Sequence, residues 1–222
     1  MVEVARVPQR EVHRTDGVAW LAGAPLPADH AVVTSLPDVS ELGGMPFAEW
    51  RAWFVDTVAL ACRQVADDAI AIFYQTDIKR EGRWVDKSFL VQLGAEAAGS
   101  SLLWHKVVCR IPPGGVAFGR PAYAHMLCVS RSRRLPSGRS SADVLPALGT
   151  MTWPRAMGTA ACEAAARFLV AETDARVVVD PFCGVGTMLA VANAYGLDAV
   201  GCELSRRRAA RAARLVLPQL AP

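Results

Sequence analysis

Residues 177–205 constrain the fold of this chain more than any other stretch. Three consecutive valines, Val177 to Val179, are typical of a buried parallel strand, and a Gly-x-Gly turn at Gly184 and Gly186 follows closely. An alanine-rich run with helical spacing comes next, and a second predicted strand ends at Glu203. Glycines let a backbone turn tightly and approach a ligand, and a helix start presents free N–H groups. The pattern predicts a βαβ unit with a ligand-binding turn.

Two short motifs within this unit narrow the choice of ligand. Glu203 lies 17 positions after Gly186, near the offset of about 20 residues at which nucleotide-type βαβ units carry a ribose-binding acid. NAD-binding domains share this layout, but Leu189 stands where their third glycine would be. The words Asp180-Pro181-Phe182-Cys183-Gly184-Val185-Gly186-Thr187 and Gly201-Cys202-Glu203-Leu204-Ser205 instead resemble motif I and the following acidic motif of S-adenosylmethionine (SAM)-dependent methyltransferases. The resemblance implies SAM as cofactor and S-adenosyl-L-homocysteine as product, with the loop facing the methionine moiety and Glu203 facing the ribose.

Length and composition indicate one well-cored globular domain. The chain has 222 residues, of which 52% are hydrophobic. No apolar run reaches the ~18 residues of a membrane span, and the charged N-terminus has no signal-peptide core, so we expect a cytoplasmic protein with no membrane partner. The six cysteines are spaced singly, without a Cys-x-x-Cys pair, so we expect reduced, mostly buried thiols and no metal site.

Charge is distributed unevenly along the chain. Residues 1–100 carry 9 basic and 14 acidic side chains, whereas residues 101–222 carry 15 basic and 7 acidic ones. Arginine dominates the excess, in two groups: Arg131, Arg133, Arg134 and Arg139, then Arg206, Arg207, Arg208, Arg211 and Arg214. Guanidinium groups match phosphate oxygens, which favours a polyanionic partner. The alternative is an ordinary solvated helix face and a flexible loop.

Strand and helix patterns alternate along the chain and predict an α/β, Rossmann-like doubly wound fold. Buried strands are expected near residues 31–34, 69–74 and 177–180, and an antiparallel hairpin near 102–109 and 123–129. Amphipathic helices are expected at 46–66 and 87–98, and a further helix is expected to start at Thr152 and continue to Val170. Residues 75–87 are expected to form a polar loop. The glycine turn comes last in this order rather than first.

That order resembles the circularly permuted (β-class) DNA N4-cytosine/N6-adenine methyltransferases, in which the catalytic motif precedes the SAM motif. The resemblance covers nearly the whole chain. It implies a mostly parallel sheet with an antiparallel hairpin. It implies that Thr15-Asp16-Gly17 holds the SAM adenine, with a plain turn as the alternative for Asp16. It also implies that Trp153-Pro154-Arg155 begins a helix that closes over SAM. The implied cofactor-binding residues are Asp16, Ser35, Trp153, Pro154, Arg155, Met157, Gly158, Asp180, Pro181, Phe182, Cys183, Gly184, Gly186, Thr187, Glu203 and Leu204.

The segment in the catalytic position of the family departs from the family pattern. Thr34-Ser35-Leu36-Pro37-Asp38 falls where the family carries Ser/Asp/Asn-Pro-Pro-Tyr, so Leu36 replaces the proline at the second position of the tetrapeptide and Asp38 replaces the final aromatic residue. In the family, the polar first residue and a backbone carbonyl accept hydrogen bonds from the target amino group, and the aromatic ring stacks on the base. A carboxylate cannot stack, but it can either accept a proton or anchor an N–H group. We expect Ser35, Pro37 and Asp38 to be catalytic.

The resemblance also predicts how the chain is divided. Residues 1–12 would be an N-terminal arm, 13–130 the catalytic half, 131–150 a mobile basic loop and 151–222 the SAM-binding half of a single permuted domain. The basic loop occupies the slot in which sequence-reading relatives carry a target recognition domain. Base readout needs several placed side chains, so a partner subunit or the shape of the substrate would supply specificity. Folded RNA exposes unstacked bases and is recognised by shape, which favours RNA over DNA.

We therefore expect a SAM-dependent methyltransferase acting on a base of structured RNA, such as tRNA or rRNA, either as a homodimer or with a specificity subunit. The alternatives are a DNA amino-methyltransferase that depends on a partner, a non-catalytic SAM-fold binding subunit and a small-molecule methyltransferase. The substrate-binding candidates are Asp77, Lys79, Trp84, Lys87 and Lys106. Ordinary surface charge remains the alternative for Lys79 and Lys87, and an exposed cap on the core for Trp84.

Overall fold

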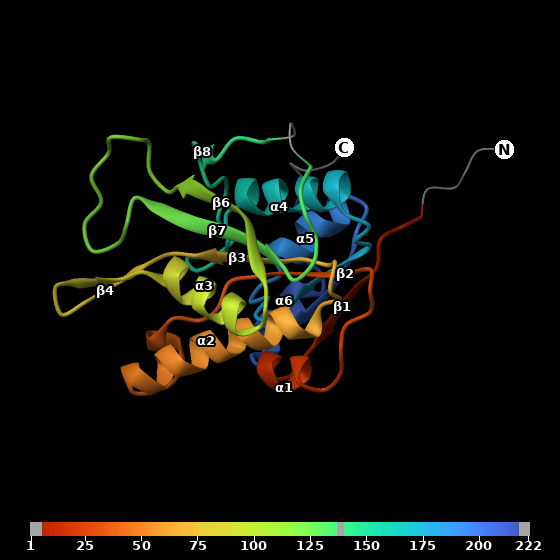
Figure 1. The fold of residues 1–222 in the computed structure, drawn as a ribbon, viewed down its shortest axis with the longest axis horizontal. Coiled ribbons are helices and arrows are strands. Elements are labelled where there is room, and N and C mark those ends of the chain that lie inside the picture. Colours follow the sequence, from red (N-terminus) through yellow and green to blue (C-terminus); the bar gives the residue numbers. More distant parts are fainter. Residues whose placement is uncertain (1–5, 137–139, 218–222) are drawn as a thin grey trace.

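The computed structural model describes residues 6–136 and 140–217, which form an eight-stranded sheet with helices on both faces (Figure 1). The sheet order is β1-β10-β9-β2-β3-β7-β6-β8. Its strands are β1 (Arg10–His13), β2 (His30–Thr34), β3 (Ala71–Gln75), β6 (Ser101–Cys109), β7 (Tyr123–Ser130), β8 (Val144–Leu145), β9 (Val177–Asp180) and β10 (Asp198–Cys202). The helices are α1 (Gly17–Leu21), the 3-10 turn η1 (Val39–Glu41), α2 (Phe47–Gln64), α3 (Lys87–Ala97), α4 (Thr159–Glu172), α5 (Thr187–Ala194) and α6 (Arg206–Ala212). None of the helices in these two ranges is both long and apolar enough to cross a membrane.

The strand directions confirm the predicted fold class. Strands β1, β10, β9, β2 and β3 are parallel, whereas β7 runs antiparallel to both β3 and β6. If β9 is counted as the first strand and β1 as the third, the order β1-β10-β9-β2-β3 becomes 3-2-1-4-5, which is the Rossmann order. The strand that precedes the glycine turn therefore lies in the middle of the sheet, although it comes near the end of the chain.

Two apolar layers cover the sheet because neighbouring strand residues point to opposite faces. Val33 and Val178 pack with α4 and α5 on one face, and Val32 and Val179 pack with α2 and α3 on the other. Figure 1 shows the same division, with α1, α2 and α3 below the sheet and α4 and α5 above it. The predicted helices at 46–66 and 87–98 are confirmed as α2 and α3.

The predicted helix start at Thr152 is wrong, because α4 begins at Thr159. The first N–H groups of α4 bond to a segment before residue 152 instead of to a preceding helical turn. Thr159 N–H donates to Thr150 O at 3.0 Å, and Ala160 N–H donates to Leu148 O at 3.0 Å. A Cβ at Gly158 would lie 1.9 Å from Leu148 O, so only glycine allows this approach. Residues 152–158 therefore form an irregular segment ahead of the helix.

The predicted polar loop at 75–87 contains a second, two-stranded sheet. Strands β4 (Ile78–Arg80) and β5 (Arg83–Val85) pair antiparallel around Glu81 and Gly82, both of which have positive φ angles. A short hairpin of charged residues has little apolar periodicity, so its sequence resembles that of a loop. In Figure 1 this hairpin extends away from the body of the protein, on the same side as the β6–β7 connection.

The segment 131–150 differs from the predicted mobile basic loop. Arg131 donates to the carbonyls of Cys62 and Val65, and Arg133 donates to Asp68 O at 2.7 Å and Glu172 O at 2.9 Å. Later in the same segment, Val144 and Leu145 form strand β8 at the edge of the sheet. These arginines fasten the segment to the body, because guanidinium forks match backbone carbonyls as well as phosphates. Arg139 lies outside the described residues, as do residues 1–5 of the predicted arm, whereas Arg10–His13 forms the edge strand β1.

Replacing Gly94 with alanine tests the packing of α3 on α2. An added Cβ would lie 2.6 Å from Val55 O and 2.7 Å from Val58 Cβ. Overpacking of this kind typically costs 1–3 kcal/mol, so we expect Gly94→Ala to lower the free energy of unfolding by about that amount in urea titrations. The matched control is Glu96→Ala on the exposed face of α3, which should change it by no more than about 0.5 kcal/mol. Equal effects in the two variants would contradict the packing.

Candidate active site

Two adjoining pockets lie at the carboxyl ends of the central strands, where open α/β sheets bind ligands. The first, of about 480 Å³, is lined by the segments that follow β1, β2, β9 and β10. The second, of about 340 Å³, is lined by the segments that follow β2 and β3 together with the β4 strand and the start of α3. Ser35, Leu36, Glu41, Arg155 and Ala156 line both pockets. A molecule in one pocket would therefore lie next to a molecule in the other.

The glycine turn after β9 has the predicted geometry. Gly184 and Gly186 have φ angles of 54° and 84°, a backbone region that favours glycine. Gly186 caps α5, and a Cβ there would lie 2.8 Å from Ala212 Cα. Gly17 allows another close approach, since its Cβ would lie 1.9 Å from Pro181 O. The two loops that were expected to bind SAM thus touch each other through glycine.

Asp180 connects the C-terminal part of the chain to the N-terminal part. Its Oδ1 accepts hydrogen bonds from Thr34 Oγ1 at 2.7 Å and from Phe182 N–H at 3.1 Å. The side chain is fully enclosed, and burial raises its pKa to about 7. The bond to Thr34 holds the strand before the glycine turn against the strand before Ser35.

Glu203 is held at the end of β10 by two donors. Its Oε1 accepts from Ser205 N–H at 2.7 Å and from Arg208 Nη2 at 2.8 Å. The Arg208 guanidinium lies 5.6 Å from the centre of the Trp153 ring, and that ring lies over Gly184. The hydrogen bond and charge of Glu203 raise the pKa of Arg208. Arg208 lines the first pocket but was not predicted as a site residue, since one arginine within a run of three carries no special signal.

The irregular segment 152–158 covers the first pocket. Thr152 Oγ1 lies 2.5 Å from Thr187 Oγ1, and Arg211 Nη2 donates to Thr152 O at 3.0 Å. Arg155 Nη1 reaches Glu41 Oε1 at 2.7 Å on the opposite rim. The segment predicted to close over SAM therefore does lie over the pocket, as an irregular cover rather than as a helix start.

Most of the predicted cofactor residues line the first pocket. They are Asp16, Ser35, Trp153, Arg155, Met157, Asp180, Pro181, Phe182, Cys183, Gly184, Thr187, Glu203 and Leu204. Asp16 also caps α1 by accepting from Ala19 N–H at 2.8 Å. Pro154 lines the second pocket instead, while Gly158 and Gly186 shape the backbone without lining either. Burial raises the pKa of Cys183 far above that of a reactive thiol, consistent with its expected role as lining.

The predicted catalytic tetrapeptide lies between the two pockets. Ser35 lines both, Pro37 lines the first and Asp38 lines the second. Pro37 O accepts from the Trp50 indole at 3.2 Å. The Asp38 carboxylate forms an ion pair with Lys87 Nζ, whose side chain is only 3% exposed. Lys87, predicted as a substrate-binding residue, therefore holds a predicted catalytic residue in place.

The second pocket contains three of the five predicted substrate-binding residues, Asp77, Lys79 and Lys87. Tyr74, Arg110 and Arg120 line it as well and were not predicted as site residues. Burial raises the pKa of Tyr74 to about 12, so its phenol stays neutral at ordinary pH. Arg110 donates to Thr76 Oγ1 at 3.1 Å. The position of Tyr74 at the end of a buried strand was the available signal for it.

The structure places the other two substrate-binding candidates elsewhere. Trp84 projects from β5, half exposed, with Lys79 Nζ 5.7 Å from the centre of its ring. Lys106 is buried, and its Nζ donates to Ser141 O at 3.1 Å and Ala142 O at 2.9 Å. Lys106 therefore lines neither of the two pockets. Its ammonium fastens the segment before β8 to the sheet, because buried backbone carbonyls need donors.

The raised pKa of Asp180 generates a prediction about pH. The folded state holds a proton on this carboxyl up to about pH 7, whereas its ordinary pKa is 3.8. The unfolded state therefore binds fewer protons between these values, and the stability contributed by Asp180 falls as pH rises across that window and levels off above it. Asp180→Asn keeps an acceptor for Thr34 and removes the titration. We expect the wild-type free energy of unfolding, measured in urea, to fall relative to that of Asp180→Asn between about pH 4 and pH 7. Parallel pH profiles would contradict this.

Comparisons with known proteins agree on the fold. No protein-family profile matches the chain, and no curated protein matches its sequence significantly. Among solved structures, the SAM complex of a Thermus thermophilus protein, provisionally described as a DNA modification methylase, is 22% identical with a TM-score of 0.68, and 92% of each chain is covered. The cytosine-N4-specific PvuII DNA methyltransferase is 15% identical with a TM-score of 0.73, covering 93% of this chain and 86% of that one. The M1.HpyAVI–SAM complex is 12% identical with a TM-score of 0.60, covering 92% and 97%. The chain therefore has the mixed α/β fold of these methyltransferase structures.

Proposed function

We propose that this protein is a SAM-dependent methyltransferase that modifies an amino group of a nucleic-acid base, with DNA as the favoured acceptor. The observation that carries the proposal is the joining of the two pockets at Ser35. We further propose a single permuted domain, in which residues 13–130 supply the catalytic half and residues 151–222 the cofactor half.

The first pocket fits SAM in size and in chemistry. Its volume of about 480 Å³ lies within the usual range of small-molecule sites. The glycine turn leaves room for the methionine part of the cofactor, and the Glu203 carboxylate accepts hydrogen bonds from ribose hydroxyls. Asp16 and the Trp153 ring provide polar and flat surfaces for the remaining part. When bound, SAM supplies an electrophilic methyl group on a sulfonium.

In the second pocket, the residues of this chain would position the acceptor and receive its proton. Ser35 stands at the boundary, where the amino group would face the cofactor pocket. Asp38 accepts a hydrogen bond from that amino group while the ion pair with Lys87 keeps the carboxylate in position. Tyr74 offers an aromatic ring at the wall of this pocket, where the tetrapeptide itself lacks one. Positioning of this kind can contribute roughly 7–11 kcal/mol to a reaction, and one proton acceptor a further 10²–10⁴-fold in rate.

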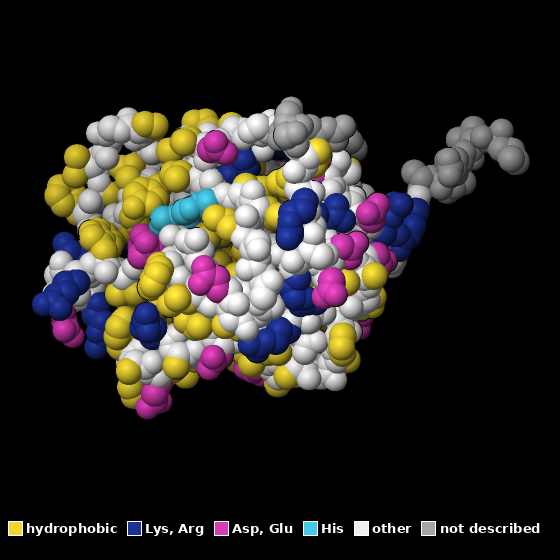
Figure 2. All heavy atoms as spheres, viewed as in Figure 1, with side chains coloured by type: hydrophobic (Ala, Val, Ile, Leu, Met, Phe, Trp, Pro, Cys, Tyr) yellow, Lys and Arg dark blue, Asp and Glu magenta, His cyan; other side chains and the backbone are white. Residues whose placement is uncertain are grey.

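Nucleic acid is the acceptor class that suits the rim of the second pocket. Lys79, Arg80, Arg110, Arg120 and Arg155 surround it and outnumber its acidic residues. Such a rim is suited to phosphates, which position a substrate without reading its sequence. Two exposed aromatic residues lie within a few positions of these basic residues in the sequence, Trp84 on the β4–β5 hairpin and Phe118 on the β6–β7 connection. Figure 2 shows hydrophobic side chains gathered over this connection.

The choice between DNA and RNA differs from the one that the sequence favoured. RNA was preferred because the chain has no recognition domain. However, the Thermus thermophilus structure is covered over 92% of its length and is nevertheless described as a DNA modification methylase. The lack of a large insertion is therefore no argument against DNA, and the PvuII enzyme of the same fold is also described as acting on DNA. A partner subunit or a second copy of the chain remains the proposed source of sequence specificity.

Calorimetry with SAM tests the first pocket. Glu203→Gln removes the charge that would bind the ribose but keeps an acceptor for Arg208 and Ser205. Hydrogen bonds to charged groups are worth about 1.5–3 kcal/mol, so we expect SAM affinity to fall roughly 10- to 100-fold. Glu49→Gln, at an exposed position of α2, is the control and should leave the affinity unchanged. SAM affinity that is equal in the wild type and in Glu203→Gln would refute the assigned cofactor site.

Transfer of a tritiated methyl group tests the acceptor. We expect the wild-type protein to label genomic DNA, and Asp38→Asn to lose at least about 100-fold in rate while it still binds SAM. Asparagine keeps a partner for buried Lys87, and Asp56→Asn on α2 is the control. Label that enters tRNA or rRNA but not DNA would overturn the choice of DNA. SAM binding without any acceptor would instead support a non-catalytic subunit.

A further inference from the structure

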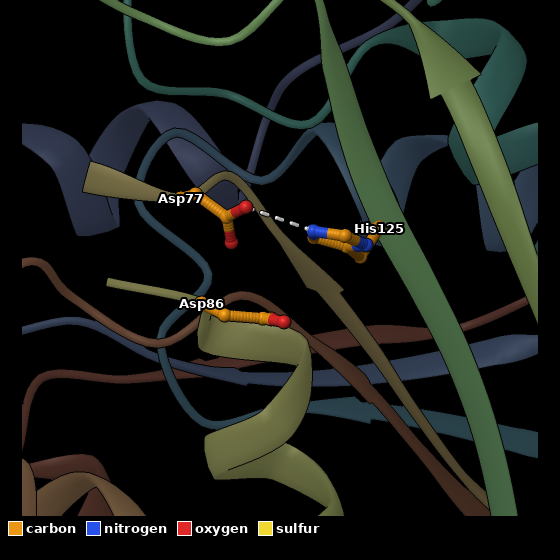
Figure 3. Close-up of side chains that lie close together, drawn as sticks. All are labelled: Asp77, Asp86 and His125. Carbon is orange, nitrogen blue, oxygen red and sulfur yellow. Dashed lines mark hydrogen bonds and ion pairs between the residues drawn. The ribbon is translucent and has the colours of Figure 1, made fainter. Parts of the chain in front are cut away.

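Three metal-ligating side chains converge beside the second pocket. Asp77 follows β3, Asp86 precedes α3 and His125 lies on β7, and Figure 3 shows the three pointing into the same space. Their available ligand atoms all lie within 4.8 Å of one another. Asp77 Oδ2 and His125 Nε2 are 3.1 Å apart. Asp77 and His125 are buried, whereas Asp86 is exposed.

Each of these side chains is held in place from its other side. Asp77 Oδ1 accepts from Lys87 N–H at 2.9 Å. One oxygen of Asp86 accepts from Ser88 Oγ at 2.7 Å and from Phe89 N–H at 3.0 Å. His125 Nδ1 lies 3.0 Å from His105 Nε2, so the second ring nitrogen of His125 has its own partner. Metal-binding histidines and carboxylates are usually oriented by such outer contacts.

The cluster combines two carboxyl groups with one imidazole. Lys87 contacts Asp77 through its backbone, while its ammonium pairs with Asp38. The Lys87 ammonium is therefore directed to Asp38 and not to the cluster. A divalent cation would match the charge of two carboxylates.

We propose that Asp77, Asp86 and His125 bind a divalent transition-metal ion, Zn²⁺ or Mn²⁺, at the wall of the second pocket. An imidazole with two carboxylates suits these ions better than Mg²⁺ or Ca²⁺, which prefer oxygen ligands. Bond lengths of about 2.0–2.2 Å separate neighbouring ligand atoms by roughly 3–4 Å, which the Asp77–His125 spacing already matches. The ion fixes the start of α3, from which Lys87 reaches Asp38. The sequence predicted no metal, because the three ligands come from separate elements and form no short motif.

Metal titration of the full chain, first stripped with a chelator, tests this site. Mn²⁺ binding is followed by electron paramagnetic resonance, because Mn²⁺ avoids the six thiols, and Zn²⁺ binding by calorimetry. We expect one bound Mn²⁺ per chain. Asp86→Asn, which keeps the cap of α3, should weaken binding at least tenfold, and Asp56→Asn should have no effect. His105→Phe should weaken binding about 10- to 100-fold by releasing His125.

Thermal unfolding gives an independent measure of the same site. Saturating metal should raise the Tm of the wild type and of Asp56→Asn, but not that of Asp86→Asn, because a ligand stabilises only the state that binds it. Neither metal binding nor the Tm measurement requires methyl transfer, so the metal site and the proposed function are tested independently. Absence of binding at millimolar Mn²⁺ and Zn²⁺, or equal affinity in Asp86→Asn and Asp56→Asn, would overturn the proposal.

Discussion

The hydrogen bond from Thr34 to Asp180 is the contact on which the rest of this site depends. It joins two residues 146 positions apart, at the ends of neighbouring central strands. Ser35 follows one of them directly, and the glycine turn follows the other. A buried carboxyl group is costly unless its hydrogen bonds are satisfied, and Asp180 satisfies this condition only when both strands are in register. The position of the proposed acceptor relative to the proposed cofactor is therefore set by the pairing of the sheet.

The carboxylates around the two pockets are held by basic partners from nearby elements. Arg208 holds Glu203, Lys87 holds Asp38 and Arg155 holds Glu41. Groups fixed before a ligand arrives lose little freedom when it binds, which is the benefit of preorganisation. The arrangement also implies competition, because the ribose proposed to bind at Glu203 would share the carboxylate with Arg208. The cation–π contact with the Trp153 ring would still hold the Arg208 guanidinium when the Glu203 carboxylate accepts other hydrogen bonds.

Local patterns predicted the parts of this structure that depend on neighbours in the chain. The glycine turn, the acid after β10, the long helix α2 and the β6–β7 hairpin follow from periodicity and spacing, and the residues of the first pocket followed from their motifs. The structure differs from the sequence-based expectations mainly in contacts between distant segments. Lys106 was taken for a substrate ligand, but it bonds to carbonyls 35 and 36 positions away. The predicted loop arginines Arg131 and Arg133 likewise bind carbonyls on α2, on the connection that follows it and on α4. No periodicity or spacing contains such information, and the same holds for Arg208.

The late position of β9 in the chain has a consequence for synthesis at the ribosome. Strand β2 emerges early, yet one of its two neighbours in the sheet is β9, and β1 must wait for β10. Both early strands therefore expose unpaired edges until the final fifth of the chain has been made. Pairings between such distant residues slow folding and prolong the exposure of unpaired strand edges, which can pair with other chains. The nascent chain consequently passes through a long aggregation-prone interval, which a chain that placed the same central strand first would shorten.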